Sequence, residues 1–125
     1  MINITEELKR INIEDFIWYI YIFIIAFNIY SNYLEKEYVK TKNPLAKKKF
    51  QTINNNILII ILIIYLYFLY ISLKDYNNLK YNDTLKRKKL TTLALLASLL
   101  FVIGGAITLY ISLNNPEIDE EVGII

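Results

Sequence analysis

The fold of this chain is decided by the stretch Ile57-Leu-Ile-Ile-Ile-Leu-Ile-Ile-Tyr-Leu-Tyr-Phe-Leu-Tyr-Ile-Ser-Leu73, which contains no charge, no glycine and no proline. A core helix of a soluble protein shows a polar face at every turn, and this stretch has none. Its length reaches the lower limit of about 17 residues that can cross the hydrocarbon core of a bilayer. The sequence therefore predicts a transmembrane helix here.

Two further apolar stretches, residues 16–34 and 90–113, are also long enough to span a membrane. A chain of 125 residues has room for one small domain and little beyond three spans. We therefore predict an all-α integral membrane protein, in which three long antiparallel transmembrane helices form a small bundle as a single membrane domain over residues 1–125. Ile4, Leu8 and Ile11 share one helical face, which predicts a short amphipathic N-terminal helix at the interface or running straight into the first span.

The signals for helix ends lie outside the apolar stretches, so each helix is expected to be nearer 30 residues than 20. Asn43 precedes Pro44, a pair that ends the first helix and opens the second. Asp83 or Thr84 can cap the third helix, which the segment Asn114-Asn-Pro116 ends.

The aromatic residues indicate how the first two spans are anchored. Trp18, Tyr19 and Tyr21 open the first span, and Tyr65, Tyr67 and Tyr70 close the second. In an antiparallel pair these rings meet at one membrane face, where amphipathic rings favour the headgroup boundary. The second span, otherwise almost entirely Ile and Leu, is expected to be a lipid-facing rod.

The third span carries small residues at alternating steps of three and four, which predicts a packing seam. Small side chains at this spacing let the backbones of membrane helices approach closely. We expect a tight helix contact inside the bundle, with self-association and a permeation path as alternatives. The seam consists of Thr91, Ala94, Ser98, Gly105, Thr108 and Ser112.

Polar residues gather at one end of the spans and predict a polar layer in one leaflet. An unpaired amide in hydrocarbon is costly, so these side chains should face other helices or water. Interhelical hydrogen bonds are the expected role, and a polar binding or conduction site is the alternative; either is expected between the first and third helices. The polar layer consists of Asn28, Ser31, Asn32, Asn54, Asn55 and Asn56.

The two connecting segments, residues 35–56 and 74–89, each hold six basic residues against two acidic ones. Basic clusters beside a membrane favour anionic lipid headgroups. Nucleic acid is not expected as a partner, because the lysines are divided between opposite membrane faces and lack an aromatic stacking platform. The residues expected to contact headgroups are Lys47, Lys48, Lys49, Lys86, Arg87, Lys88 and Lys89.

Orientation is only weakly determined by charge. With the N-terminus inside, eight basic residues lie on the cytoplasmic side and six on the other side. We expect a cytoplasmic N-terminus and an external C-terminus, with mixed insertion as an alternative. The acidic tail over residues 114–125 matches no calcium-binding loop and is expected to be solvated; capture of its apolar end by a peptide groove is the alternative.

Catalytic motifs are absent from this sequence. It has no cysteine and no histidine, and it contains no phosphate-binding loop, no nucleophile elbow and no charged residue inside a span. We therefore expect no enzymatic activity, cofactor or metal. The expected function is that of a small bacterial-type protein of the cell membrane, acting by helix contact with itself or with a membrane partner. The alternatives are a homo-oligomeric pore, a holin-like protein or small transporter, and an immunity-type membrane protein.

Overall fold

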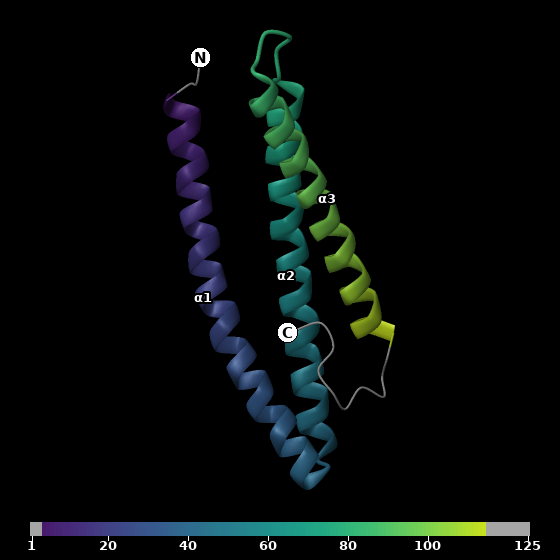
Figure 1. Ribbon diagram of the computed structural model, residues 1–125. Helices are drawn as coiled ribbons and strands as arrows, with labels where there is room; N and C mark the ends of the chain where they lie inside the picture. Colours follow the sequence, from purple (N-terminus) through teal and green to yellow (C-terminus); the bar gives the residue numbers. More distant parts are fainter. Residues whose placement is uncertain (1–3, 115–125) are drawn as a thin grey trace. The chain divides into compact units, whose positions relative to one another are not determined.

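A computed structural model describes residues 4–114, which form three long α-helices (Figure 1). They are α1 (Ile4–Thr41), α2 (Pro44–Asn77) and α3 (Leu85–Asn114). At 1.5 Å per residue they are about 57, 51 and 45 Å long, well beyond the ~30 Å hydrocarbon core of a bilayer. All three are long and apolar enough to span a membrane. The predicted all-α fold with three membrane-spanning helices is confirmed; the acidic residues of the tail, Glu117, Asp119, Glu120 and Glu121, lie outside the described residues.

The helix α1 starts at Ile4 and continues without a break to Thr41. The amphipathic N-terminal segment therefore runs straight into the first span. Four buried residues, Ile17, Ile24, Ser31 and Leu34, lie on one face of α1, since the first three are separated by steps of seven.

The chain forms two compact parts, an N-terminal part of residues 1–54 and a C-terminal part of residues 55–125, with the boundary inside α2. In the N-terminal part, the end of α1 packs against the start of α2. Phe50 is 0% exposed there, and its ring lies 6.1 Å from that of Tyr38, measured between centroids. In the C-terminal part, the rest of α2 pairs with α3. The single domain expected from the sequence stays a prediction.

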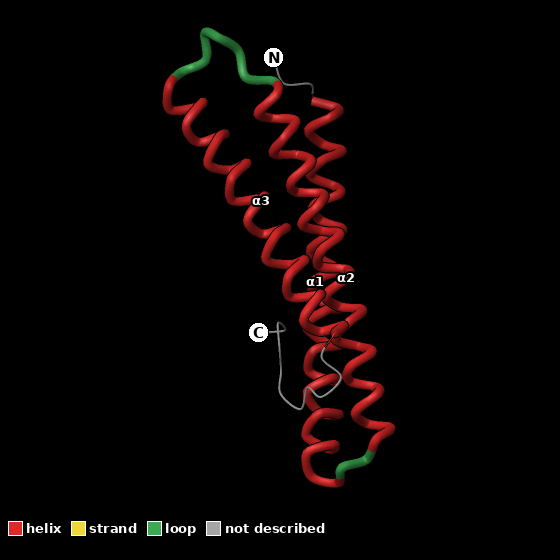
Figure 2. The backbone as a smooth tube through the Cα atoms, turned by 90° about the vertical axis from the view of Figure 1, so that its right-hand side faces the viewer, coloured by secondary structure: helices red, strands yellow, loops and turns green. Residues whose placement is uncertain are grey.

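The turn between α1 and α2 is short, as Figure 2 shows. Lys42 adopts φ 56°, and its N–H donates to the Tyr38 carbonyl oxygen at 2.7 Å, which closes α1. The Asn43 side-chain oxygen then accepts the Leu45 N–H at 3.0 Å and caps α2. Pro44 occupies the first helical position, where its missing N–H costs nothing. The Asn43-Pro44 pair therefore separates the two helices as predicted.

The turn between α2 and α3 is longer (Figure 2). Side-chain hydrogen bonds of Asp83 and Thr84 close it. The hydroxyl of Thr84 accepts the Arg87 N–H at 3.1 Å and caps α3. The carboxylate of Asp83 instead accepts the Lys80 N–H at 2.6 Å inside the turn. Of the two caps that the sequence allows, Thr84 is the one that caps the helix.

The expectation that the second span is a lipid-facing rod is wrong for one side of α2, whereas Ile59, Ile60, Ile63 and Leu66 are exposed as expected. Ile57, Leu58 and Ile64 of α2 are buried, whereas α3 has no buried residue. The uniform Ile and Leu composition hides this difference, because apolar side chains suit a lipid contact and a helix contact equally well.

Candidate functional site

The small-residue seam of α3 lies against α2 within the C-terminal part. At Gly105, a Cβ atom would lie 3.1 Å from Cδ2 of Tyr65 and 3.4 Å from Cδ1 of Leu62. The hydroxyl oxygens of Ser98 and Ser72 are 2.8 Å apart, so one donates to the other. Ser98 and Gly105 therefore meet a helix of the same chain.

The remaining seam residues have different surroundings. Ser112 donates to the side-chain oxygen of Asn55 on α2 at 2.5 Å. Thr108 turns back to its own helix and donates to the Gly104 carbonyl oxygen at 2.8 Å. Thr91 is half-buried and Ala94 is exposed. The seam thus combines contact with α2 at some positions and open surface at others.

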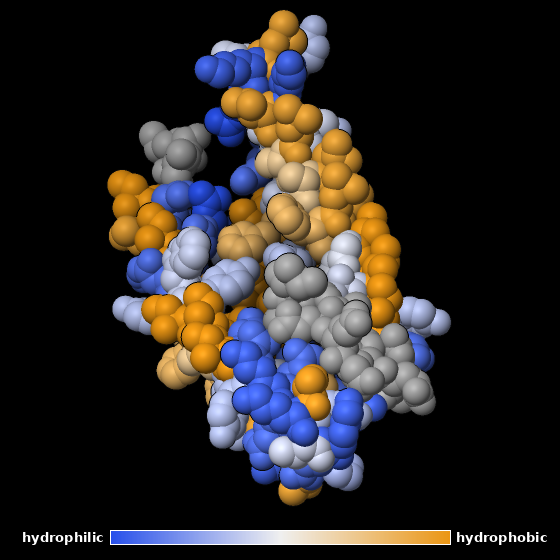
Figure 3. Space-filling model, turned by 60° about the horizontal axis from the view of Figure 1, so that its bottom comes forward, coloured by the Kyte–Doolittle hydropathy of each residue, from blue (hydrophilic) through white to orange (hydrophobic). Residues whose placement is uncertain are grey.

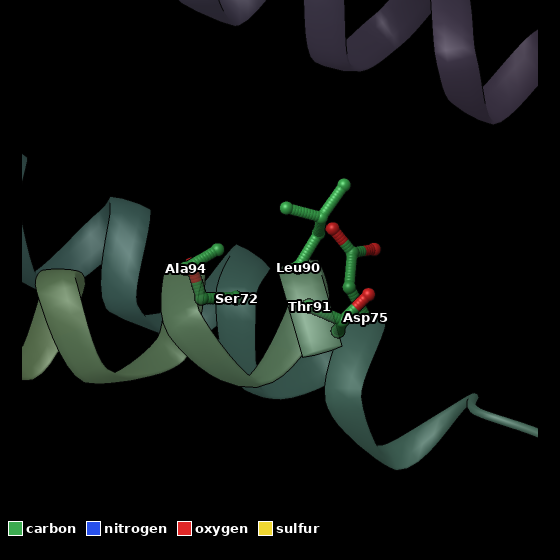
Figure 4. A pocket seen from close by; sticks show the side chains of 5 residues that line it. All are labelled: Ser72, Asp75, Leu90, Thr91 and Ala94. Carbon is green, nitrogen blue, oxygen red and sulfur yellow. The ribbon is translucent and has the colours of Figure 1, made fainter. Parts of the chain in front are cut away.

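Thr91 and Ala94 line a shallow hollow of about 200 Å³ between α2 and α3, together with Ser72, Asp75 and Leu90. Figure 4 shows that Ser72 and Asp75 come from α2 and the other three residues from α3. The hollow lies where the apolar run of α2 gives way to the charged turn. It holds one carboxylate and two hydroxyls, which are groups suited to water at a membrane boundary.

In the N-terminal part, Ser31 of the polar layer connects α1 to α2 by hydrogen bonds. Ser31 is 2% exposed, and its hydroxyl donates to the side-chain oxygen of Asn54 at 2.6 Å. The same hydroxyl lies 3.5 Å from the Phe50 carbonyl oxygen. The side-chain oxygen of Asn28 is buried without a hydrogen-bond partner, and Asn32 is exposed.

Consecutive asparagines of α2 form hydrogen bonds with different helices. Asn54 accepts from Ser31 of α1 in the N-terminal part, and Asn55 accepts from Ser112 of α3 in the C-terminal part. Asn56 is exposed. Neighbouring residues of a helix point about 100° apart, which accounts for the division. A polar layer shared by all three helices stays a prediction, as does a site between the first and third helices.

The basic residues expected at headgroups lie at the two turns. Figure 3, with the α1–α2 turn brought forward, shows hydrophilic residues gathered at that end. Lys47 is half-buried, and its Nζ lies 5.3 Å from the Tyr38 ring centroid, as does that of Lys42; Lys48 and Lys49 are exposed. At the other turn, Lys88 is half-buried, and Lys86, Arg87 and Lys89 are exposed.

The helix contacts of Ser72, Tyr65 and Tyr38 are not predicted from the sequence, although Tyr65 is among the rings expected to anchor the second span. The contact of Ser72 could have been predicted, because Ser72 is the one serine or threonine in the apolar run over residues 57–73. Tyr65 resembles the other tyrosines near the span end, yet its ring packs 5.4 Å from the Phe101 ring. No pattern in the sequence distinguishes Tyr65 from Tyr67 or Tyr70.

The paired groups are neutral hydroxyls, amides and aromatic rings, which are suited to positioning helices. Within residues 4–114, no cluster of three or more acidic side chains is placed to hold a metal ion. Comparisons with protein-family models, with curated proteins and with solved structures found no match. The three candidate spans indicate a small multi-pass membrane protein in contact with the lipid bilayer.

Proposed function

We propose that this chain is a non-enzymatic membrane protein that works by helix contact, and that its contact surface is the outer side of α3 around Gly104. The partner is a second copy of the chain or another membrane protein. The proposal is supported by one observation: a Cβ atom built on Gly104 meets nothing within 4 Å, whereas one built on Gly105 meets Tyr65 and Leu62.

Adjacent glycines thus have separate environments. The close approach of α2 explains why residue 105 is a glycine. No contact within the described residues explains the glycine at position 104, although glycine in a helix interior is about 1 kcal/mol less favourable than alanine. Ala97, seven residues earlier, is also small and exposed. Together they leave a shallow strip against which another helix backbone can pack.

Gly104→Leu tests this surface, because the open space around Gly104 accepts the larger side chain without disturbing the contact with α2. Ala106→Leu is the matched control, since Ala106 is also small and exposed but points about 200° away from Gly104. Crosslinking and complex size in mild detergent should show loss of assembly for Gly104→Leu alone. An unchanged complex in Gly104→Leu contradicts the proposal.

A homo-oligomeric pore, including the holin-like type, is the alternative, and an immunity-type protein is a further one. The buried side-chain oxygen of Asn28 favours a polar path in the N-terminal part. The contacts of Asn54 and Asn55 with serines oppose it, because they occupy the amides. Controlled expression with a membrane-potential dye separates the two: a collapsed potential supports the pore, and an intact potential with abundant protein supports the contact protein.

The proposed orientation places the N-terminus in the cytoplasm and the C-terminus outside the cell. It rests on eight basic residues against six. Reporters at both termini and in both turns should show activity on opposite sides for successive positions. Equal activity of one reporter on both sides indicates mixed insertion instead.

A further inference from the structure

The turn between α2 and α3 carries an exposed aromatic ring and an exposed leucine among basic residues. Tyr81 is 98% exposed and Leu85 is 84% exposed. We propose that this turn, with the first turn of α3, binds anionic lipid headgroups of the same bilayer that the α2–α3 hairpin spans. The proposal is independent of any assembly through Gly104. The basic residues of the surface are Lys80, Lys86, Arg87, Lys88 and Lys89.

The turn is held in place before any lipid binds. The Lys80 N–H donates to the Asp83 carboxylate at 2.6 Å, and the Asp83 N–H donates to the Lys80 carbonyl oxygen at 3.0 Å. The Thr84 cap then starts α3. These bonds use the polar groups of the backbone and leave the Tyr81 side chain pointing outward. A surface that is already ordered loses less conformational entropy when it binds.

The basic side chains divide into engaged and free ones. Lys88 donates to the Tyr81 carbonyl oxygen at 2.8 Å, and its Nζ lies 5.4 Å from the Tyr81 ring centroid. The Arg87 Nε lies 3.8 Å from the Asp83 carboxylate. Within residues 4–114, the side chains of Lys80, Lys86 and Lys89 have no hydrogen-bond or ion-pair partner. Three ammonium groups therefore remain for anions.

The depth of the turn matches the headgroup layer. The apolar run of α3 begins at Leu90, and Leu85 lies about 8 Å beyond it along the helix. The polar layer of a bilayer adds roughly 5–8 Å on each side of the hydrocarbon core. Leu85 thus lies within the headgroup layer, where the amphipathic ring of the neighbouring Tyr81 is also favoured. A lysine in this zone meets lipid phosphates.

A lipid surface fits this combination better than a soluble polyanion. Nucleic acid would pair with the lysines but leave the exposed Leu85 without an apolar partner. In the headgroup layer, the lysines contact phosphates and the surrounding lipids cover part of the exposed Leu85 side chain. The charge balance agrees, because residues 74–89 hold six basic and two acidic residues.

A tryptophan at the turn reports on its lipid neighbours. In the full chain, Trp18→Phe removes the one native tryptophan, and Tyr81→Trp places the reporter while keeping a ring near Lys88. The protein is reconstituted in phosphatidylcholine vesicles that contain a lipid brominated near the top of its acyl chains. That lipid is phosphatidylglycerol in one series and phosphatidylcholine in the other. Stronger quenching by brominated phosphatidylglycerol at equal mole fraction is the expected result.

The lysine-to-glutamine variant K80Q/K86Q/K89Q should remove this excess quenching, with about a fivefold loss of anionic preference for each lysine. The matched control is K36Q/K40Q/K48Q, which removes the same charge near the other end of α2 and should leave the signal unchanged. Equal quenching by both lipids overturns the proposal, and so does excess quenching that survives K80Q/K86Q/K89Q. Loss of the excess on adding inorganic phosphate or an oligonucleotide at constant ionic strength also overturns it, because the occupant is then soluble.

Discussion

Gly105 of α3 and Tyr65 of α2 set the closest approach of the two helices in the C-terminal part. A Cβ atom on Gly105 would lie 3.1 Å from the Tyr65 Cδ2 atom, tighter than an ordinary van der Waals contact. The Tyr65 ring also lies 5.4 Å from the Phe101 ring, one helical turn before Gly105. The close packing of the hairpin therefore requires a glycine at position 105, opposite the large ring of Tyr65.

Gly105→Leu should destabilise the α2–α3 hairpin by about 1–3 kcal/mol, because the added side chain overpacks the contact with Tyr65. Unfolding of the monomer in mixed detergent micelles measures the change. Combining Gly105→Leu with Tyr65→Ala should recover part of the loss, since the smaller residue leaves room. Gly104→Leu is the control for this measurement and should not destabilise the chain, because the space is open and leucine favours a helix more than glycine does; equal losses at both glycines contradict the assignment.

Ser72 and Ser98 form a hydroxyl pair inside the same hairpin. Their coupling in a double-mutant cycle with Ser72→Ala and Ser98→Ala should be about 0.6 kcal/mol, the average for hydrogen bonds between membrane helices. Additive effects of the two substitutions on the unfolding free energy count against a direct bond. Thr92→Ala is a suitable reference, because the Thr92 hydroxyl donates to the Lys88 carbonyl oxygen of its own helix.

Alanine substitutions at the neighbouring residues Asn55 and Asn56 should have different effects on the free energy of unfolding. Asn55→Ala should destabilise the chain by about 1 kcal/mol, because it leaves the Ser112 hydroxyl without its acceptor. Asn56→Ala should change the unfolding free energy little, since Asn56 is exposed. A larger effect at Asn56 than at Asn55 contradicts the hydrogen-bond assignment. The comparison holds residue type and depth nearly constant.

Lys42 occupies the left-handed region at the end of α1, with φ 56°. Lys42→Gly should stabilise the N-terminal part by about 0.5 kcal/mol, because relief of roughly 1 kcal/mol of backbone strain exceeds the loss of an exposed cation–π contact with Tyr38 of about 0.5 kcal/mol. Thermal unfolding in detergent monitors the change. The control, Lys36→Gly, lies inside α1 and should destabilise by about 1 kcal/mol; if Lys42→Gly destabilises as well, the strain argument fails.

The sequence by itself determined the spans and the helix breaks, and it limited the cap of α3 to Asp83 or Thr84. Long apolar stretches, the Asn43-Pro44 pair and Thr84 act through local energies: the cost of polar groups in lipid, the fixed φ of proline and the orphan N–H groups of a helix start. Such energies depend on a few neighbouring residues, so they can be read along the chain.

The tertiary structure decided which face of each helix meets another. Sequence spacing grouped Asn54, Asn55 and Asn56 together. Only the packing shows that Asn54 accepts a hydrogen bond from Ser31 and that Asn55 accepts one from Ser112. Spacing placed Gly105 but not Gly104 in the seam, yet only the packing shows that Tyr65 of α2 lies against Gly105 and that nothing within residues 4–114 lies against Gly104. In lipid, isoleucine and leucine are equally favourable against acyl chains and against another helix. Buried and lipid-facing positions of a uniformly apolar helix therefore have the same residue types, and the sequence does not distinguish them. The contact faces are determined only when the helices pack.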